Sequence, residues 1–558
     1  MSKLAIIGLD GGTFRVIDYL ISKNRLPNIA KMMRKGSRAT LLSTIPVLTP
    51  AAWTTFSTGM NPGRHGVFDF FRRSGEGYLL TPVNANSIKG ETIWSIASRH
   101  GKRVCVYNVP VTYPANPVNG ILISGMDSPR MDGQAIYPRE FKEKILAELP
   151  DFIFEPAING EYLVKNFKDP VAAHIRDLNE YLQVQINAFN YLMSLEDWDL
   201  FVGVIRSPDV MQHTFWREVE KVKEFGEEAV SEEELQRAEV VFGCYEALDR
   251  EIGERWLDGA PDRNLMMMSD HGFGLLRREV ALNRLLADAG LLKFNQKNYL
   301  KKSKEYLYGK IASSIPEKTR QKIVRKRHEQ DGYLSVDRLM VDVDWSKTHV
   351  YSQGRYGCLF VNLKERESMG IVNEKERQAV IKETIAALES VVDPEDGKPI
   401  VTTVHLGNEI YHGPMKFLVP DMVVNMRNYS YRVIPNTRDE LGAKSLIRKP
   451  MPHWQEVAHT GNHRRDGIFI LYGPDAAHAD LDEVDMVDIV PTIANLLGLP
   501  HLDEWDGRIL EEALGSGARK ITADHSEHER DSDGARNDVY SQDDEEEIRK
   551  RLENLGYL

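Results

Sequence analysis

Short apolar runs alternate with longer amphipathic stretches along most of the chain. The short runs predict buried strands, and the stretches between them carry apolar residues at helical spacing. The predicted strands lie at 4–9, 102–107, 120–124, 199–204, 264–269, 348–352, 358–362, 419–424 and 466–471. The predicted helices start near 51 and lie at 92–100, 171–195, 232–256, 374–391 and 488–497. Because strands alternate with helices, the pattern predicts an α/β fold with a doubly wound, mostly parallel central sheet flanked by helices.

Residues 292–330 interrupt this alternation. They hold 12 Lys and Arg against 3 Glu, a net charge of +9, with tyrosine and aliphatic residues at roughly helical spacing. We interpret residues 292–343 as an inserted pair of basic helices that covers the core. The positive charges either form the water-exposed face of amphipathic helices or attract a polyanion or an anionic membrane. Peripheral membrane contact is therefore one predicted role.

The insertion divides the chain into four predicted parts: residues 1–291 as the first part of the core, 292–343 as the insertion, 344–514 as the second part of the core, and 515–558 as an acidic linker with a short C-terminal helix at 544–555. Residues 521–558 carry 12 acidic and 5 basic side chains, a net charge of −7. The remaining chain is only mildly acidic, because the whole protein of 558 residues has a net charge of −12. This balance gives no reason to expect a nucleic-acid partner.

Composition and cysteine usage narrow the class of protein and its expected compartment further. An apolar content of 42% and a charged content of 28% are ordinary for a soluble globular protein. Cys105, Cys244 and Cys358 lie far apart, without the spacing of a disulfide framework or a thiolate metal site, and they fit a reducing compartment. The chain begins without a signal-peptide pattern, and it contains no apolar run of about 18 residues. We therefore expect a cytoplasmic protein without a transmembrane segment.

Candidate chemistry is concentrated in five short segments. Asp10 follows the first predicted strand, Asp209 and His213 follow the fourth, and Asp270 and His271 follow the fifth. Thr49 precedes a proline where a helix is expected to begin, so its hydroxyl faces the positive helix end, a suitable place for an anionic substrate. The fifth segment is HTGNH, with His459 and His463.

Each segment alone has an ordinary structural explanation, such as a turn residue or a surface pair. Together they offer three carboxylates, up to three imidazoles and one hydroxyl at one predicted sheet edge. Asp and His sets without thiolates suit Zn²⁺, with Mn²⁺ as the alternative. Seven ligands exceed one tetrahedral site and suit two divalent ions that share a hydroxyl nucleophile for phosphoryl transfer.

The chain resembles the type I phosphodiesterase/nucleotide pyrophosphatase family of the alkaline phosphatase superfamily. The matching segments are LDGG, the Thr49 stretch ending in TGMNPGRHG, PDVMQH, SDHG, GNHRRDGIFILYGP and DIVPTIANLLGLP followed by DGRIL, over residues 3–512. The resemblance implies a metal-dependent phosphohydrolase with a phospho-threonine intermediate, a small phosphate-ester substrate and an alkaline phosphatase-like core.

The resemblance also assigns roles to residues. Asp10, Asp270 and His271 would bind one metal ion with Thr49, the nucleophile, as its fourth ligand. Asp209, His213 and His463 would bind the second ion, with His459 as the alternative to His463. His65 matches a further family position and is expected to support the turn after the nucleophile helix.

One departure from the family leaves the substrate open. Nucleotide pyrophosphatases carry an asparagine downstream of the nucleophile that contacts the phosphoryl oxygens, and this chain has Ala52 there. The sulfatase branch is excluded, because it requires a Cys or Ser nucleophile with Pro and Arg at positions that this chain fills differently. A phosphomonoesterase, a transferase of phospho-head groups and a catalytically silent anion-binding scaffold remain as alternatives.

Overall fold

A computed structural model gives the arrangement of the chain. It describes residues 2–73, 78, 80–155, 160–257, 262–295, 343–434, 445–450, 452–454, 457–515, 523–524, 539–555 and 557. Most of the predicted basic insertion and most of the predicted acidic linker lie outside the described residues.

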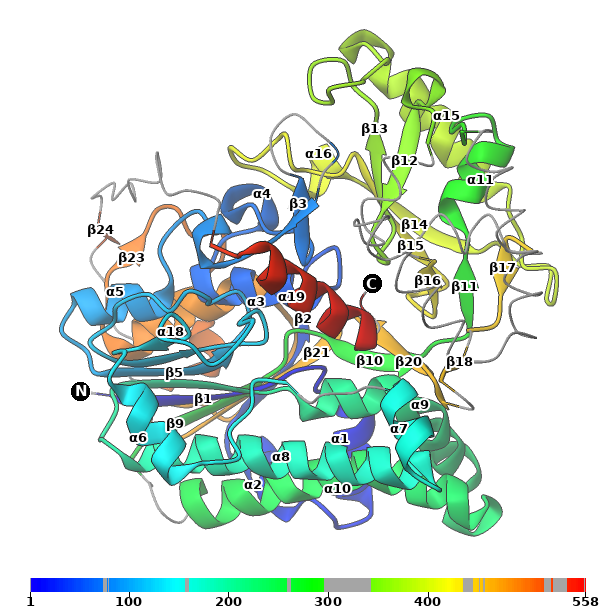
Figure 1. Ribbon diagram of the computed structural model, residues 1–558. Coiled ribbons are helices and arrows are strands. Elements are labelled where there is room, and N and C mark those ends of the chain that lie inside the picture. Colours follow the sequence, from blue (N-terminus) through cyan, green and yellow to red (C-terminus); the bar gives the residue numbers. More distant parts are fainter. Residues whose placement is uncertain are drawn as a thin grey trace.

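The central element is a nine-stranded sheet (Figure 1). Its strands, from edge to edge, are β22 (Ala479–Asp485), β2 (Ser37–Leu42), β21 (Asp466–Tyr472), β9 (Asn264–Met268), β1 (Leu4–Leu9), β8 (Leu200–Ile205), β5 (Val104–Val109), β6 (Gly120–Ser124) and β7 (Ile136–Tyr137). Five of the eight neighbouring pairs are parallel. The predicted α/β class with a mostly parallel sheet is confirmed.

The strand β21 runs antiparallel to both of its neighbours, β2 and β9. The chain reaches β21 directly from His463, at the edge where the parallel strands end, so this strand has to run back across the sheet. The predicted strand at 466–471 is therefore central in position but opposite in direction to the parallel set.

Helices cover both faces of this sheet (Figure 1). Alternate residues of β1 divide between two cores, with Ile7 in one and Ile6 in the other, as the two-residue period of a strand requires. The helices on the Ile7 side are α1 (Phe14–Ser22), α2 (Pro27–Lys35), α8 (Pro170–Ser194), α9 (Ser207–Phe225) and α10 (Glu232–Glu251), which continues as a π-helix at Ile252–Leu257. Those on the Ile6 side are α3 (Thr49–Thr58), α5 (Ile93–Arg99) and α18 (Ile489–Leu497).

A smaller lobe stands beside the large sheet and has its own core (Figure 1). It contains the sheet β12 (Val350–Gln353), β13 (Cys358–Val361), β15 (Met422–Met426) and β14 (Val401–Leu406), together with α11 (Leu282–Asp288), α15 (Arg377–Glu389) and α16 (Gly407–Ile410). The predicted strand at 419–424 belongs to this lobe and not to the central sheet.

Two small sheets complete the fold. One pairs β10 (Gly272–Leu275) with β20 (Gly461–Arg464). The other has the order β16 (Tyr431–Val433), β11 (Arg278–Val280) and β17 (Ile447–Arg448), and its apolar side chains belong to the core of the smaller lobe. The remaining elements are α4 (Pro62–His65), α6 (Phe141–Glu148), α7 (Gly160–Asn166), β3 (Phe71–Arg73), β4 (Leu80–Pro82), β18 (Pro452–Trp454), β19 (Val457–Ala458), β23 (His501–Leu502) and β24 (Ala523–Asp524).

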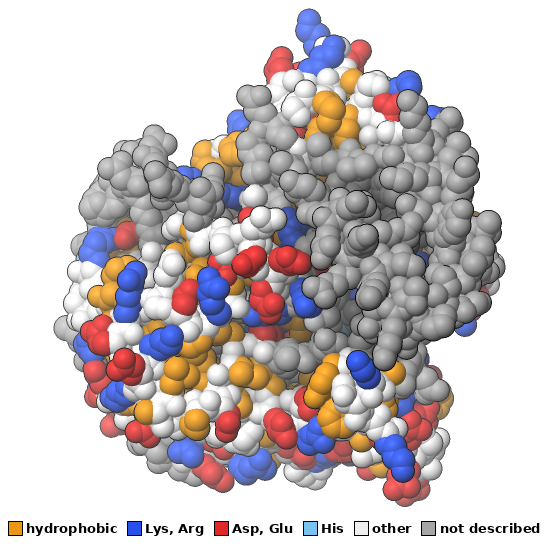
Figure 2. Space-filling view, in the orientation of Figure 1, with side chains coloured by type: hydrophobic (Ala, Val, Ile, Leu, Met, Phe, Trp, Pro, Cys, Tyr) orange, Lys and Arg blue, Asp and Glu red, His pale blue; other side chains and the backbone are white. Residues whose placement is uncertain are grey.

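The predicted C-terminal helix is present as α19 (Gln542–Asn554), which crosses the front of the molecule between the two lobes (Figure 1). The three cysteines are buried free thiols. None of the described helices combines the length and the apolar composition needed to cross a bilayer. On the face turned to the viewer in Figure 2, described charged side chains of both signs are interspersed.

Candidate metal centre

Three adjacent parallel strands place acidic side chains at one edge of the central sheet. Asp10 follows β1, Asp270 follows β9, and Asp209 lies in the first turn of α9 directly after β8. The strand β1 pairs with both β8 and β9 in parallel register, and the Asp10 amide donates to the Ile205 carbonyl at 3.0 Å. Carboxyl ends of neighbouring parallel strands form the usual ligand site of an α/β sheet.

The two-stranded sheet of β10 and β20 places His463 at the same edge of the central sheet. His271 immediately precedes β10, and β10 pairs with β20 so that Phe273 lies opposite His463. As a result the His463 ring stacks on the His271 ring, with centroids 3.6 Å apart and an interplanar angle of 19°.

Thr49 is the first residue of α3, after an extended Leu48. Its side chain is fully buried, and Oγ1 lies 3.4 Å from Nε2 of His271. Because α3 begins with Thr49-Pro50, the hydroxyl lies at the positive end of a ten-residue helix.

The ligand atoms fall into two groups that share His271. One group joins Asp10, Asp270 and His271, and the other joins Asp209, His271 and His463; within each group the ligand atoms lie within 4.8 Å of one another. His213 adjoins the second group, because its Nε2 lies 3.4 Å from Oδ1 of Asp209 and 3.1 Å from Nε2 of His463. The seven residues predicted from the sequence are thus brought together.

Backbone carbonyls fix the tautomers of the three histidines. Nδ1 of His213 donates to the Gly461 carbonyl at 3.1 Å, Nδ1 of His271 to the Gly272 carbonyl at 3.1 Å, and Nδ1 of His463 to the Val47 carbonyl at 3.0 Å. Each Nε2 therefore carries a lone pair, and the Nε2 atoms of His213 and His463 face each other. A cation bound by both nitrogens relieves this repulsion, and a carbonyl partner on Nδ1 is the usual support of a metal-bound imidazole.

The carboxylates also require positive charge. Oδ1 of Asp10, Oδ1 of Asp209 and Oδ2 of Asp270 are buried and accept no hydrogen bond within the described part of the chain. Burial raises the pKa of Asp10 to about 8, against the opposing charge of Arg206. Burial and the neighbouring Asp10 raise the pKa of Asp270 well above its ordinary value, and burial lowers the pKa of His271 well below its own. The residues therefore fit divalent cations, which would keep these carboxyl groups ionised.

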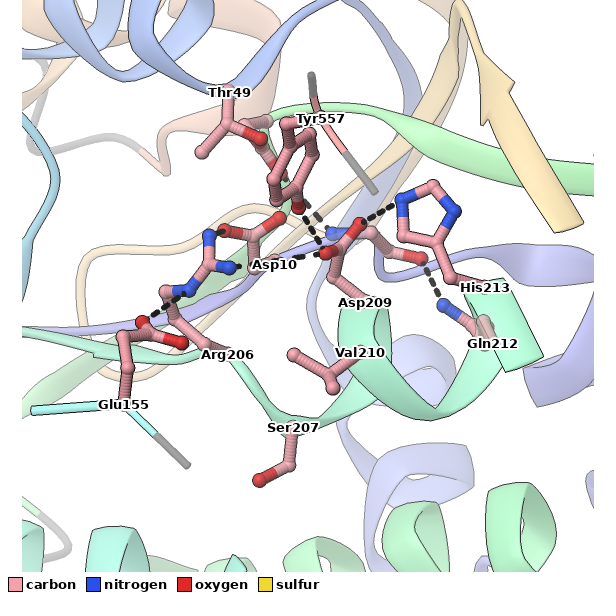
Figure 3. A network of polar contacts seen from close by, with 12 residues as sticks. Asp10, Thr49, Glu155, Arg206, Ser207, Asp209, Val210, Gln212, His213 and Tyr557 are labelled. Atoms are coloured by element: carbon pink, nitrogen blue, oxygen red, sulfur yellow. Dashed lines mark hydrogen bonds and ion pairs between the residues drawn. The ribbon is translucent and has the colours of Figure 1, made fainter. Parts of the chain in front are cut away.

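Arg206 and Glu155 are buried at the centre without having been predicted as functional (Figure 3). Nη1 of Arg206 lies 2.8 Å from Oδ2 of Asp10, Nε lies 2.8 Å from Oε1 of Glu155, and Nη2 lies 3.9 Å from Oδ2 of Asp209. One guanidinium thus bridges an acid from each ligand group. Its place directly before the SPD segment was visible in the sequence, but its contact with Glu155 was not.

Tyr557 is a second residue that sequence analysis missed. Its hydroxyl donates to Oδ2 of Asp209, and its ring lies 5.6 Å from the His213 ring at 90° (Figure 3). Contacts of the preceding segment hold it there: Tyr540 stacks on Tyr113 at 5.5 Å, and Nη1 of Arg551 donates to the Ser128 carbonyl at 2.7 Å. No local sequence pattern marks a tyrosine so distant in the chain as part of the site.

Three other residues from the sequence analysis lie outside the two ligand groups. Nδ1 of His459 is 3.4 Å from Nη1 of Arg432, so His463 and not His459 reaches the ligand atoms. His65 contacts Oγ1 of Thr55 at 2.9 Å and accepts from the Val67 amide at 3.1 Å, which fixes the turn after α3. Ala52 is buried and offers no side-chain donor.

A family model described as type I phosphodiesterase/nucleotide pyrophosphatase matches residues 4–463. No curated protein matches the chain. The matched region contains Asp10, Thr49, Asp209, His213, Asp270, His271 and His463, and it ends before Tyr557.

Proposed function

The chain belongs to the type I phosphodiesterase/nucleotide pyrophosphatase family, and from that membership we propose that it cleaves phosphate diesters at a two-metal site through a phospho-threonine intermediate on Thr49. Family membership and the two ligand groups make it a metal-dependent phosphohydrolase. The diester preference, the second metal ion and the covalent intermediate are the parts that we propose.

The observation that carries the proposal is the position of Thr49. Its Oγ1 lies 3.4 Å from His271, the residue common to both ligand groups, and it lies at the positive end of α3. A phosphoryl group at this point would be held against the helix end, with the hydroxyl oxygen beside the phosphorus.

The proposed ligand sets are those that the family resemblance implies. Asp10, Asp270 and His271, with Thr49, would hold one ion, and Asp209, His213 and His463 would hold the other, with His213 in the second set in place of the shared His271. When bound, two divalent ions stabilise the attacking and leaving oxygens of an in-line displacement and lower the pKa of a coordinated hydroxyl. Zn²⁺ is the first ion to test and Mn²⁺ the second, because the donors are imidazole and carboxylate without thiolate.

The proposed reaction has two steps. Oγ1 of Thr49 loses its proton and forms a bond to phosphorus, while the bond from phosphorus to the leaving oxygen breaks; the leaving oxygen gains a proton and departs as an alcohol. Water then forms the next bond to phosphorus, the bond to Oγ1 breaks, and the threonine hydroxyl is restored with release of a phosphate monoester.

The test compares bis(p-nitrophenyl) phosphate with p-nitrophenyl phosphate under metal supplementation. Thr49→Ala should lower diester turnover about 10³-fold or more. Thr58→Ala is the matched control, because its hydroxyl lies at the other end of α3, where it donates to the Thr54 carbonyl at 2.8 Å and accepts from the Met60 amide at 3.4 Å. Full activity of the Thr49→Ala protein would reject the nucleophile.

Other outcomes decide between the alternatives. Faster Thr49-dependent cleavage of the monoester would make the protein a phosphomonoesterase. Transfer of the phosphoryl group to an added alcohol in place of water would make it a transferase. Acid quenching during turnover of the diester should leave one p-nitrophenyl phosphoryl group on the Thr49 peptide, and steady turnover without it would reject the intermediate.

A further inference from the structure

The turn that joins β12 to β13 brings Tyr356 of the smaller lobe to the metal centre. Its hydroxyl lies 3.5 Å from Nε2 of His463, one of the proposed metal ligands. Its ring is stacked with the His463 ring, with centroids 5.2 Å apart and an interplanar angle of 28°. The smaller lobe therefore contributes a hydroxyl group to a site whose proposed ligands all come from the rest of the chain.

The backbone of this turn is closely constrained. Gly354 and Gly357 have φ angles of 74° and 73°, in the left-handed region that residues with a side chain rarely adopt. A Cβ at Gly357 would also lie 2.4 Å from the Val424 carbonyl oxygen. The Gly357 carbonyl accepts from the Val424 amide at 3.0 Å. The Arg355 carbonyl accepts from the Val433 amide at 3.0 Å. These contacts with β15 and β16 hold the turn, so the fold itself sets the position of the tyrosine.

The hydroxyl of Tyr356 has an acceptor that a metal ion would take away. Nδ1 of His463 donates to the Val47 carbonyl, so Nε2 carries the lone pair to which Tyr356 donates. Among the described residues, this is the one hydrogen bond of the Tyr356 hydroxyl. An ion bound by Nε2 would use the same lone pair. The phenol would then lie beside the ion without an acceptor, which is unfavourable for a hydroxyl in a largely enclosed site.

The neighbouring carboxylate of Asp209 is already engaged. Its Oδ2 accepts from the hydroxyl of Tyr557. Its Oδ1 lies 3.4 Å from Nε2 of His213 and 3.4 Å from Nε2 of His463, where the second ion would bind. Both oxygens therefore have partners, and the Tyr356 hydroxyl is left for an oxygen that arrives with the substrate.

Tyr356 and Thr49 contact two members of the same ligand group. Oγ1 of Thr49 lies 3.4 Å from Nε2 of His271, and the Tyr356 hydroxyl lies 3.5 Å from Nε2 of His463. The rings of these two histidines are stacked, with centroids 3.6 Å apart. A phosphoryl group that Thr49 attacks beside this ligand group would thus lie within reach of the phenol.

We propose that Tyr356 donates a hydrogen bond to a non-bridging phosphoryl oxygen of the substrate and so holds the phosphorus in line for attack by Thr49. A hydrogen bond to a charged oxygen is stronger than one between neutral groups. Ala52, on the nucleophile helix, is buried and offers no side-chain donor, so the smaller lobe would supply one. This inference rests on the proposed function.

The first test is Tyr356→Phe, which keeps the ring stacked on His463 and removes only the hydroxyl. With saturating Zn²⁺, kcat/KM for bis(p-nitrophenyl) phosphate should fall about 10-fold to 100-fold, the effect of losing one hydrogen bond to a charged oxygen. Tyr431→Phe is the matched control, because its hydroxyl, also in the smaller lobe, donates to Asp393 and should leave kcat/KM unchanged.

A second readout does not depend on turnover. Orthovanadate forms five-coordinate complexes that resemble the transition state of phosphoryl transfer, and titration calorimetry measures its affinity. Zn²⁺-loaded Tyr356→Phe should bind vanadate about 10-fold more weakly than wild type. The affinity for Zn²⁺ itself should equal or exceed that of wild type, because the hydroxyl competes with the ion for Nε2 of His463.

Unchanged kcat/KM or unchanged vanadate affinity in Tyr356→Phe would each overturn the inference, as would wild-type protein that binds no vanadate. A loss of Zn²⁺ affinity would also overturn it, since Tyr356 would then be a metal ligand or a positioning residue for His463. If wild-type protein cleaves no phosphate ester, the proposed function fails. The two vanadate affinities then decide on Tyr356 alone.

Discussion

The hydroxyl of Tyr557 donates a hydrogen bond to Oδ2 of Asp209, although 348 residues separate the two in the chain. The other oxygen of the same carboxylate, Oδ1, lies 3.4 Å from His213 and 3.4 Å from His463. One oxygen is thus held by the phenol while the other faces the two imidazoles. Carboxylate ligands of metals are commonly oriented in this way by a hydrogen bond to the second oxygen.

Tyr557→Phe should therefore weaken metal binding by about 10-fold to 100-fold. The reason is that Asp209 loses the donor that orients it, while the ring contacts with His213, at 5.6 Å, and with Phe70, at 4.8 Å, are kept. Titration with Co²⁺ would measure both the affinity and the absorption spectrum of the bound ion, and saturating metal should restore turnover.

Tyr540→Phe serves as the control for this prediction, because Tyr540 lies on the same terminal segment and its hydroxyl donates to the Asp127 carbonyl at 3.1 Å, away from the metal centre. Higher turnover of Tyr557→Phe at every metal concentration would mean that the phenol obstructs the site instead of orienting Asp209.

Arg206→Leu should destabilise the metal-free protein by about 3–5 kcal/mol, because it leaves Asp10 and Glu155 buried without their shared cation. Bound divalent ions supply positive charge to Asp10, so the loss should be smaller in the metal-loaded protein. Urea unfolding with chelator and with metal measures both values. Equal losses in the two conditions would show that Arg206 contributes through packing alone.

Asp270→Asn should reduce the metal content by one ion per chain, because a neutral amide replaces one of the carboxylates in the ligand group of Asp10, Asp270 and His271. Elemental analysis after dialysis against Zn²⁺ gives the count. Asp288→Asn, on the surface of α11, is the control. An unchanged count in Asp270→Asn would reject the ligand set of Asp10, Asp270 and His271.

Chelation should lower the unfolding temperature of the wild-type protein. Removal of bound ions leaves Asp10, Asp209 and Asp270 close together and buried, with Arg206 as the one arginine that contacts them among the described residues. Calorimetry before and after chelation checks this, and re-addition of metal should reverse the shift. The Asp270→Asn protein should show a smaller shift than wild type.

His65 should make the protein sensitive to acid. Burial lowers the pKa of His65 to about 3, against about 6.5 in an unfolded chain. Between these values the unfolded state binds a proton that the folded state does not, so stability is present above pH 6.5 and is lost as the pH falls towards 3. The loss is about 1.4 kcal/mol per pH unit.

His65→Asn should flatten this part of the stability profile, although it also costs stability at neutral pH through the lost contacts with Thr55 and Val67. Urea unfolding from pH 7 to pH 4 measures the slope for both proteins. Parallel profiles would show that His65 does not titrate in this range.

The sequence was sufficient to predict those parts of the site that depend on which residues are neighbours in the chain. Asp10, Asp209 and Asp270 each follow an apolar strand, so their convergence follows from any parallel arrangement of those strands. The position of Thr49 at the start of a helix was predicted from the proline that follows it. The direction of β21 was not predictable from its apolar run, since a buried strand has the same composition in either orientation.

Residues that act through long-range contacts were not predictable in this way. Glu155 reaches Arg206 from outside any recognisable motif, and Tyr557 reaches Asp209 from the far end of the chain. The alignment of Glu279 with Arg432 and Arg448 depends on the register of β11 against two strands, β16 and β17, that follow it more than 140 residues later. No periodicity encodes such pairings, because each depends on how the whole chain folds.

The position of β21 between β2 and β9 has a consequence for synthesis of the protein. The strand β2, at Ser37–Leu42, pairs only with β21 and β22 in the central sheet, and both begin after residue 465. At translation rates of about 5–20 residues per second, β2 waits roughly 20–85 s for its first sheet partner. During that time both edges of β2 and, once β9 has been made, the edge of β9 that later pairs with β21 are open to pairing with other chains. A growing chain of this protein therefore exposes unpaired strand edges until the ribosome has passed β21.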